Sequence, residues 1–276
     1  MDEITAEYST DQIAPSASLR FYPRITVACK TDLGRVRENN EDKFEYFMPE
    51  DHATLGSRGQ IFLVCDGMGG HAAGQIASEL TAKTFIDVYL HHPAADATVA
   101  MAAGVTAANR FVCDIGRAVP SRRGMGTTLS GLILLQDKAY TVQVGDSRIY
   151  RMRQGELFLM THDHTWIEEQ IRAGVLTPEQ AETHPYKHVL TRAVGTEGDP
   201  VEPDIEGHDL KPGDLFMICS DGVMNHVPDD RIAELMSEGA PSEIAWKIVG
   251  EALVGGGSDN TTVMIVRVNE VEEIAE

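Results

Sequence analysis

One stretch, residues 61–71 with the sequence IFLVCDGMGGH, places the strongest constraint on how this chain can fold. Its first five residues are all apolar, which is too short for a buried helix and typical of a buried strand. Asp66 follows directly, and the glycines after it allow the backbone to turn sharply. A carboxylate at the end of a core strand is costly to desolvate, so we expect Asp66 to be paired or to bind a metal ion.

The same pattern occurs twice more near the other end of the chain. Residues 215–221, LFMICSD, are again an apolar run that ends in an aspartate, and residues 258–260, SDN, stand directly before the strand-like segment TTVMIVRV. If that last strand lies antiparallel beside the other two, its beginning meets their ends. The carboxylates of Asp66, Asp221 and Asp259 then converge, and this geometry predicts a divalent-metal site.

The length of 276 residues is close to the upper size of a single hydrophobic core, so one catalytic domain is expected. We place it at residues 20–269, between a flexible N-terminal tail at 1–19 and an acidic C-terminal tail at 270–276. The 23 Lys and Arg against 43 Asp and Glu give a formal net charge of −20. Nucleic acids and anionic membranes bind clustered cations, so neither is expected as a partner. We expect a monomer.

The four cysteines, Cys29, Cys65, Cys113 and Cys219, form no CxxC pair and have no metal-finger spacing. We therefore expect reduced thiols in the core. The N-terminus carries no basic segment followed by an apolar one, and no run of 18 apolar residues occurs. These patterns predict a soluble cytoplasmic protein.

Apolar periodicity predicts both strands and helices, in an order that favours a layered α+β domain. Short links between successive strands, such as residues 145–147, are typical of hairpins and hence of antiparallel sheets, with helices packed outside. The predicted strands are 25–29, 43–47, 61–65, 127–135, 139–144, 148–152, 201–206, 215–220 and 261–268, and the predicted helices are 72–90, 95–111, 229–236 and 241–253.

Residues 161–195 interrupt this series of strands. TWIE at 165–168 and TPEQ at 177–180 both fit capping boxes, and Gly174 stands where the first short helix would stop. The segment also carries His162, His164, His184 and His188. Because their spacings match no zinc pattern, we expect an inserted surface element here rather than a metal held by histidines.

Three functional classes are compatible with single features of the chain. GMGGHA at 67–72 fits a dinucleotide-binding fingerprint, but Asp66 would lie beside the pyrophosphate and no βαβ unit follows. A calcium-binding module without chemistry is disfavoured because no EF-hand loop is present. A hydrolase with two clustered cations needs oxygen ligands from several strands and a cation for the substrate anion. The aspartates and Arg37 meet those needs, although residues 37–42 taken alone are typical of a solvated charged turn.

Eight short motifs, taken in order, resemble the successive motifs of the bacterial type 2C metal-dependent protein serine/threonine phosphatases. The resemblance extends from about residue 25 to residue 268. It implies a four-layer α-β-β-α sandwich of two antiparallel sheets flanked by helices, with a manganese or magnesium pair at one edge and a flap at 161–195 beside the active site. The motifs are VRENNEDKF, FLVCDGMGGHAAG, GTTLSG, YTVQVGDSRIYR, THDHTW, HVLTRAVG, FMICSDGV and GGGSDNTTV.

The resemblance also implies roles for individual acidic residues. Asp66 is expected to bridge two tightly bound metal ions, and the carbonyl of Gly67 is expected to serve one of them. Asp221 and Asp259 complete the pair. Asp146 resembles the ligand of a third, weaker metal.

Further residues are expected around the metals. Glu41 and Asp42 lie at the acidic N-terminal motif of the family, as a water-mediated ligand and a support behind the ligands. Arg37 matches the phosphate-holding arginine, so Arg37 and the three aspartates of the metal pair are expected to carry catalysis. Asn260 is expected to orient Asp259 or a metal-bound water.

The activity implied is the hydrolysis of phosphoserine and phosphothreonine in proteins, opposing a bacterial Ser/Thr kinase. Two cations close together can turn a bridging water into hydroxide near neutral pH, and this hydroxide attacks phosphorus directly without a phosphoenzyme. One departure is Met68, which stands where animal members carry the histidine proposed as general acid; His71 lies nearby in sequence. The alternative is a weakly active or inactive regulatory binding module with the same fold.

Overall fold

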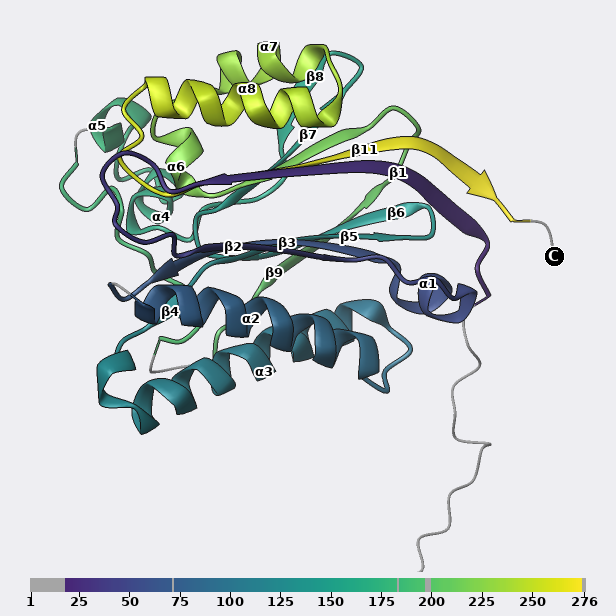
Figure 1. The fold of residues 1–276 in the computed structure, drawn as a ribbon, viewed down its shortest axis with the longest axis horizontal. Coiled ribbons are helices and arrows are strands. Elements are labelled where there is room, and N and C mark those ends of the chain that lie inside the picture. Colours follow the sequence, from purple (N-terminus) through teal and green to yellow (C-terminus); the bar gives the residue numbers. More distant parts are fainter. Residues whose placement is uncertain (1–17, 71, 183, 197–199, 275–276) are drawn as a thin grey trace, which may run out of the picture.

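The computed structural model describes residues 18–70, 72–182, 184–196 and 200–274. Two antiparallel sheets pack face to face, and helices cover the outer face of each sheet (Figure 1). The predicted four-layer sandwich of two antiparallel sheets flanked by helices is therefore confirmed. The predicted N-terminal tail lies almost entirely in residues 1–17, outside the described residues.

The first sheet contains, in spatial order, β1 (Phe21–Asp32), β11 (Thr261–Glu273), β10 (Leu215–Cys219), β7 (Arg148–Arg153) and β8 (Glu156–Leu159). The second contains β2 (Asp42–Phe47), β3 (Gln60–Met68), β5 (Leu129–Leu135), β6 (Lys138–Val144) and β9 (Asp204–Asp209), with β4 (Gly126–Thr127) paired to β3. The helices are α1 (His52–Arg58), α2 (Ala72–His91), α3 (Ala97–Ala118), α4 (Trp166–Arg172), α5 (Pro178–Glu182), α6 (Asp221–Met224), α7 (Asp229–Ser237) and α8 (Pro241–Val254), with a short 3-10 helix at Pro120–Arg122.

The apolar runs in the sequence are continuous because the central strands are buried on both faces. Side chains alternate along a strand, so neighbouring residues enter different cores. In β3, Leu63 packs toward α2 and α3, whereas Phe62 faces the other sheet. In β10, Met217 packs toward α7 and α8, whereas Phe216 enters the same space between the sheets. Three apolar layers thus hold the four structural layers together.

The hairpin predicted at residues 145–147 is wrong. β6 pairs with β5 and β9, whereas β7 pairs with β10 and β8, so the short link carries the chain from one sheet to the other. Gly145 has a φ of +100°, and a Cβ there would lie 2.6 Å from Thr128 Cγ2. The link therefore turns sharply where it packs against Thr128, directly before β5. Asp146 then lies between the ends of the two sheets.

The last strand differs from its prediction in two ways. β11 lies antiparallel beside β10 and β1 but not beside β3, which belongs to the facing sheet. It also continues past residue 268 to Glu273, because β1 begins at Phe21 and pairs along its whole length. Within this extension Arg24 Nε donates to Glu272 Oε2 at 2.7 Å. This contact offsets part of the negative charge of the segment predicted to be an acidic C-terminal tail.

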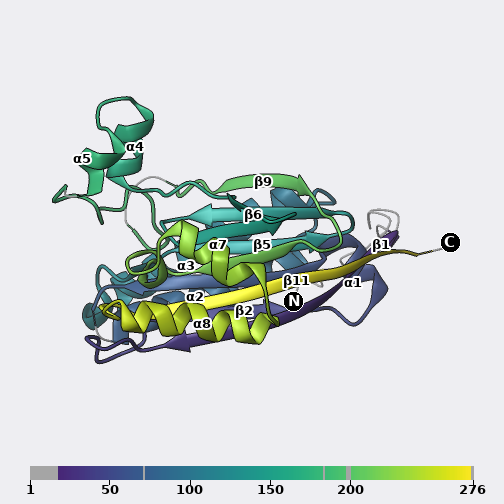
Figure 2. The same ribbon diagram turned by 90° about the horizontal axis from the view of Figure 1, so that it is seen from above.

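The insert between β8 and β9 contains the two predicted short helices, α4 and α5, and projects from one corner of the sandwich (Figure 2). Thr165 Oγ1 accepts from the backbone N of Glu168, and Gly174, with a φ of +70°, follows the end of α4. Thr177 and Gln180 cap α5 reciprocally. The capping box at 177–180 is thus confirmed, and at 165–168 the Thr165 half of the predicted box is formed.

Two helices, α1 and α6, were not predicted from the sequence. α1 starts after Asp51, whose Oδ1 accepts from the backbone N of Thr54 at 2.8 Å. An aspartate at that spacing is a valid N-cap signal. None of the helices in the described part of the chain is both long and apolar enough to cross a membrane.

Candidate active site

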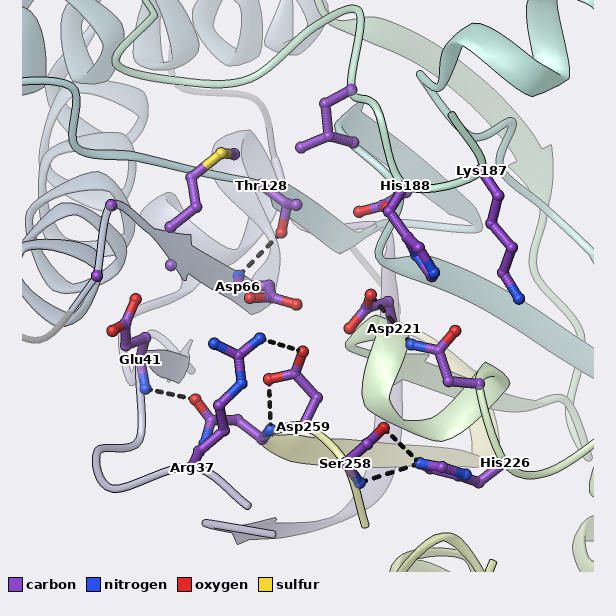
Figure 3. Close-up of a pocket in the computed structure, with 18 residues that line it drawn as sticks. Arg37, Glu41, Asp66, Thr128, Lys187, His188, Asp221, His226, Ser258 and Asp259 are labelled. Atoms are coloured by element: carbon purple, nitrogen blue, oxygen red, sulfur yellow. Dashed lines mark hydrogen bonds and ion pairs between the residues drawn. The ribbon is translucent and has the colours of Figure 1, made fainter. Parts of the chain in front are cut away.

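A cavity of about 600 Å³ opens where the C-terminal part of β3, the end of β10 and the start of β11 meet. We call it the catalytic cavity, and Figure 3 shows its lining. Carboxylates from both sheets converge there, as the sequence predicted. Asp221 and Asp259 lie at the ends of the neighbouring strands β10 and β11, whereas Asp66 reaches the cavity from the facing sheet. Its charged lining includes Arg37, Glu41, Asp66, Asp146, Asp221 and Asp259, and the backbone of Gly67 also contributes.

Asp66 is held from both sides by threonines at the break between β4 and β5. Its backbone N donates to Thr128 Oγ1 at 2.9 Å, and its carbonyl accepts from the backbone N of Thr128 at 2.9 Å. Thr127 Oγ1 donates to the same carbonyl at 2.8 Å. These bonds fix the Asp66 backbone while its carboxylate faces the cavity (Figure 3).

Asp221 is the first residue of α6, directly after β10. Asn225, one turn later, donates from Nδ2 to Asp221 Oδ2 at 3.2 Å. The other oxygen, Oδ1, is buried and has no hydrogen-bond partner among the described residues. A buried carboxylate oxygen is rarely left in this state unless a ligand completes it.

Glu41 reaches the cavity through space that two glycines leave. Its carbonyl accepts from Gly67 N at 3.2 Å and from Ser78 Oγ at 2.6 Å. A Cβ on Gly74 would lie 2.0 Å from Glu41 Oε2, so only glycine at this position in α2 admits the carboxylate. Gly74, which follows the glycine loop in the sequence, is therefore part of α2 and also leaves room for a side chain of the site.

Arg37 pairs with Asp259 at the cavity rim. Its Nη2 lies 2.6 Å from Asp259 Oδ2, and its side chain is 52% exposed, so the guanidinium can also reach an incoming anion. The expected role of Asn260 is only partly matched: its backbone N, not its side chain, donates to Asp259 Oδ1. The Asn260 side chain instead accepts from Glu41 N and donates to the carbonyls of Leu33 and Asn39. These bonds tie the charged segment that contains Glu41 to the start of β11.

Asp42 lies opposite Asp66 in the β2–β3 pair but does not line the catalytic cavity. It is buried between the sheets, where Oδ2 accepts from Ser220 Oγ and from Thr262 Oγ1, both at 2.7 Å. Asp42 therefore connects β2 to both β10 and β11, behind the group of acids that faces the cavity.

Burial and mutual repulsion raise the pKa values of these carboxylates. Burial raises the pKa of Asp66 well above its usual range, and the charges of Asp42, Asp221 and Asp146 raise it further. Burial, with repulsion from Asp221, raises the pKa of Asp42 and of Asp146 to about 7. Cations bound among these acids would relieve both burial and repulsion.

The donor set fits hard divalent cations. Carboxylate and carbonyl oxygens favour Mg²⁺ or Mn²⁺ over zinc, and the unpartnered Asp221 Oδ1 is a ready ligand. In the arrangement shown, no three His, Cys, Asp or Glu side chains among the described residues are close enough to hold one ion. Arg37 supplies positive charge to Asp259 in this arrangement.

Several cavity residues were not identified from the sequence, namely Thr128, Lys187, His188, Leu190, Asn225, His226 and Ser258. Lys187 and His188 come from the insert, where the spacing of the histidines matched no metal-binding pattern. His226 Nε2 accepts from the backbone N of Ser258 at 3.1 Å, which links α6 to the loop before Asp259. Met68 also lines the cavity, whereas His71 lies outside the described residues.

His164 has a structural role at the base of the insert. Its Nδ1 accepts from Gly145 N at 3.2 Å, and its Nε2 lies 3.0 Å from Asp204 Oδ2. Burial lowers the pKa of His164. Nδ1 thus holds the segment that carries Asp146, and Nε2 connects the insert to the start of β9.

The raised carboxylate pKa values predict that the metal-free protein loses stability as the pH rises. Unfolded aspartates titrate near 3.9, whereas Asp42 and Asp146 titrate at about 7 in the folded chain. Between about pH 4 and about pH 7 the unfolded chain releases protons that the native state keeps, so the free energy of unfolding falls as the pH increases. Chemical denaturation in chelator across this range measures the decline.

Asp146→Asn provides the control, because it removes one of the two groups and should make the decline shallower. Added Mn²⁺ should restore most stability at the high end of the range, where the acids are ionised. An unfolding free energy in chelator that does not fall over this range would contradict the assigned pKa values.

Comparison with known proteins agrees with the geometry. The family model described as protein phosphatase 2C matches residues 35–248. The serine/threonine protein phosphatase PstP of Mycobacterium tuberculosis is 34% identical over 244 residues, which are 88% of this chain and 45% of that protein. A putative protein phosphatase 2C-type of Streptococcus pyogenes is 32% identical over 254 residues, 91% of this chain and 100% of the relative.

Solved structures give the same result. The serine/threonine phosphatase of S. agalactiae superposes with a TM-score of 0.81 at 33% identity, covering 89% of this chain and 100% of that one. The catalytic domain of PstP in complex with two manganese ions has a TM-score of 0.75 at 33% identity, covering 89% of this chain and 99% of that one. The chain spans about half the length of full PstP but the whole of the streptococcal relative. From its sequence motifs, its fold and its convergent carboxylates, this chain belongs to the protein phosphatase 2C family.

Proposed function

We propose that this chain is a metal-dependent protein serine/threonine phosphatase that hydrolyses phosphoserine and phosphothreonine by direct attack of water on phosphorus. The observation that carries the proposal is the convergence of five carboxylates and one arginine in a single cavity, in a chain of this family. Nothing in the geometry favours the alternative of an inactive binding module, because the acids that such a module could lose are all present.

Asp66, Asp221 and Asp259, with the carbonyl of Gly67, would hold two Mn²⁺ or Mg²⁺ ions. Asp146 would serve a third, weaker ion, and Glu41 would act through water. When bound, the cations supply positive charge to the phosphate oxygens and lower the pKa of coordinated water. The protein's own part is to hold the ligands in place through the Thr128 and Asn225 contacts described above.

Arg37 stands at the rim of the cavity with an exposed guanidinium, so it would orient the phosphate and balance its charge. A cysteine phosphoenzyme is disfavoured, because burial raises the pKa of Cys29 and Cys219 to about 12 and neither residue lines the cavity. The leaving group must gain a proton, and Met68 cannot donate one. The proton for the leaving group would come from water or from another group that lines the cavity.

An assay of the purified chain on a phosphothreonine peptide and on p-nitrophenyl phosphate, with Mn²⁺, Mg²⁺, Zn²⁺ or chelator, tests the proposal. Turnover is expected with Mn²⁺ or Mg²⁺ and is expected to stop in chelator. Full activity in chelator would rule out the metal-dependent reaction, and peptide binding without turnover under any of these metals would favour the regulatory module.

We also propose that the chain acts as a cytoplasmic monomer on proteins phosphorylated by a Ser/Thr kinase.

Asp146→Asn should leave the two tight cations bound while lowering turnover by about 10-fold, since it removes a ligand outside the central pair. Asp146 lies on the link between the sheets, where Gly145 N donates to His164 Nδ1 and Gly145 packs against Thr128. Calorimetric titration with Mn²⁺ and steady-state kinetics measure the two effects separately. Loss of the tight pair in this variant would make Asp146 one of its primary ligands.

A further inference from the structure

A second cavity, of about 560 Å³, lies beside the catalytic cavity. We call it the flap cavity; α4 and α5 of the insert line one side, and α6 with the start of α7 lines the other. Lys187, His188 and Asp221 line both cavities, so the two are continuous. Figure 3 shows Lys187 and His188 beside Asp221 at this shared wall.

The flap cavity has an apolar inner surface. Ile167 and Ile171 of α4, Ala181 of α5 and Met224 of α6 contribute it, and Ile167 and Ala181 are buried. A surface of this kind suits the methylene stem of a long side chain. It does not by itself identify the group at the end of that stem.

The charges around the flap cavity identify that group as a cation. Arg148 is neutralised within the cavity wall, because Asp163 accepts from its Nε at 2.9 Å and from its Nη2 at 2.8 Å. Asp146 and Asp221 are assigned to the metal ions. The remaining carboxylates are those of Glu168 and Asp229, which line the flap cavity but not the catalytic cavity.

These two carboxylates are positioned by different elements. Glu168 lies in the first turn of α4, which Thr165 caps, and its side chain is only partly exposed. Asp229 begins α7 and accepts from Tyr150 Oη at 2.9 Å, while Arg148 Nη1 donates to the same Tyr150 oxygen at 3.1 Å. The Arg148 network thus links the base of the insert to α7.

We infer, on the basis of the proposed phosphatase activity, that the flap cavity binds a lysine or arginine side chain of the phosphoprotein substrate, close in sequence to the phosphorylated residue. The apolar wall takes the stem, and Glu168 with Asp229 takes the charged end. Lys187 lines both cavities, so its charge is also available to the substrate phosphate. The flap cavity thereby selects substrates by their sequence.

Matched phosphothreonine peptides test this inference. One lysine is moved from three residues before to three residues after the phosphothreonine, and each lysine peptide is compared with its norleucine counterpart, which keeps the stem and lacks the charge. The wild-type chain is expected to favour lysine at one or two positions by about 10-fold in kcat/KM, because two carboxylates face the cation and Glu168 is only partly exposed. The preference should shrink as salt is added.

Glu168→Gln should reduce that preference to about 2-fold while leaving the norleucine peptides and p-nitrophenyl phosphate unaffected. Glu169→Gln is the matched control, because Glu169 is the next residue of α4, is exposed and does not line the cavity. This control should keep the wild-type preference. Unchanged turnover of p-nitrophenyl phosphate shows that each variant is folded.

The same peptides with a non-hydrolysable phosphonate in place of the phosphate give dissociation constants, which separate the inference from the proposed function. A lysine preference in binding without any hydrolysis would overturn the proposed function alone. Hydrolysis with no lysine preference at any position would overturn the flap-cavity assignment. Equal losses of the lysine preference in Glu168→Gln and Glu169→Gln would overturn it as well. So would a loss of turnover on p-nitrophenyl phosphate equal to the loss on the lysine peptides.

Discussion

Asp66→Asn is expected to lower kcat/KM for a phosphothreonine peptide by on the order of 10²-fold or more in the presence of Mn²⁺. The substitution keeps the shape of the side chain and its fixed backbone but removes the charge that two cations would share. Steady-state kinetics over a range of Mn²⁺ concentrations measure the loss. Turnover at the wild-type level would show that Asp66 is not a metal ligand.

The same variant should be at least as stable as the wild-type chain in chelator. Burial and neighbouring acids raise the pKa of Asp66, so its ionised form destabilises the metal-free fold at neutral pH. Thermal unfolding in chelator tests this, with Asp42→Asn as the comparison. Asp42 is buried and accepts two hydroxyl hydrogen bonds, so its replacement disturbs contacts between the sheets. A marked loss of stability in Asp66→Asn would mean that its inactivity reflects misfolding.

Arg37→Ala should lower kcat/KM by about 10- to 100-fold, mainly through a higher KM, because a guanidinium can bind a phosphate through two hydrogen bonds. Arg37→Lys keeps the charge without the planar fork and should recover only part of the loss. Steady-state kinetics on a phosphothreonine peptide measure both variants.

Metal affinity separates this role from a structural one. Arg37 pairs with Asp259 at 2.6 Å, so its removal should leave Mn²⁺ binding unchanged or tighter, as measured by calorimetric titration. Weaker Mn²⁺ binding together with an unchanged KM would show that Arg37 supports the metal ligands and does not contact the substrate.

The central strands were predictable because their signal is local, whereas β8 was missed and β9 lies at Asp204–Asp209 instead of 201–206. A run such as residues 61–65 is apolar at every position since alternate side chains enter different cores, and the carboxylate that follows stands out against it. Asp66, Asp221 and Asp259 therefore could be found from sequence alone. Their placement in one cavity also followed, because strand ends of both sheets meet at the same end of the sandwich.

The sheet that each strand joins was not predictable in the same way. A three-residue link suits a hairpin or a crossing between sheets equally well, and the outcome at Gly145 depends on its contact with Thr128, which is distant in sequence. The same limit applies to Lys187, His188 and His226, which reach the catalytic cavity only through long-range packing. Neighbouring residues carry no pattern that reports such contacts.

The pairing of β1 with β11 has a consequence for how the chain assembles. β1 is an edge strand of its sheet, and its neighbour there is β11, so β1 waits for more than 200 further residues before it finds its partner. Strands β2 to β6, in contrast, pair largely with strands close to them in sequence. The second sheet can therefore form before β11 has been synthesised, whereas the first sheet closes only after it, because contacts of high sequence separation form slowly.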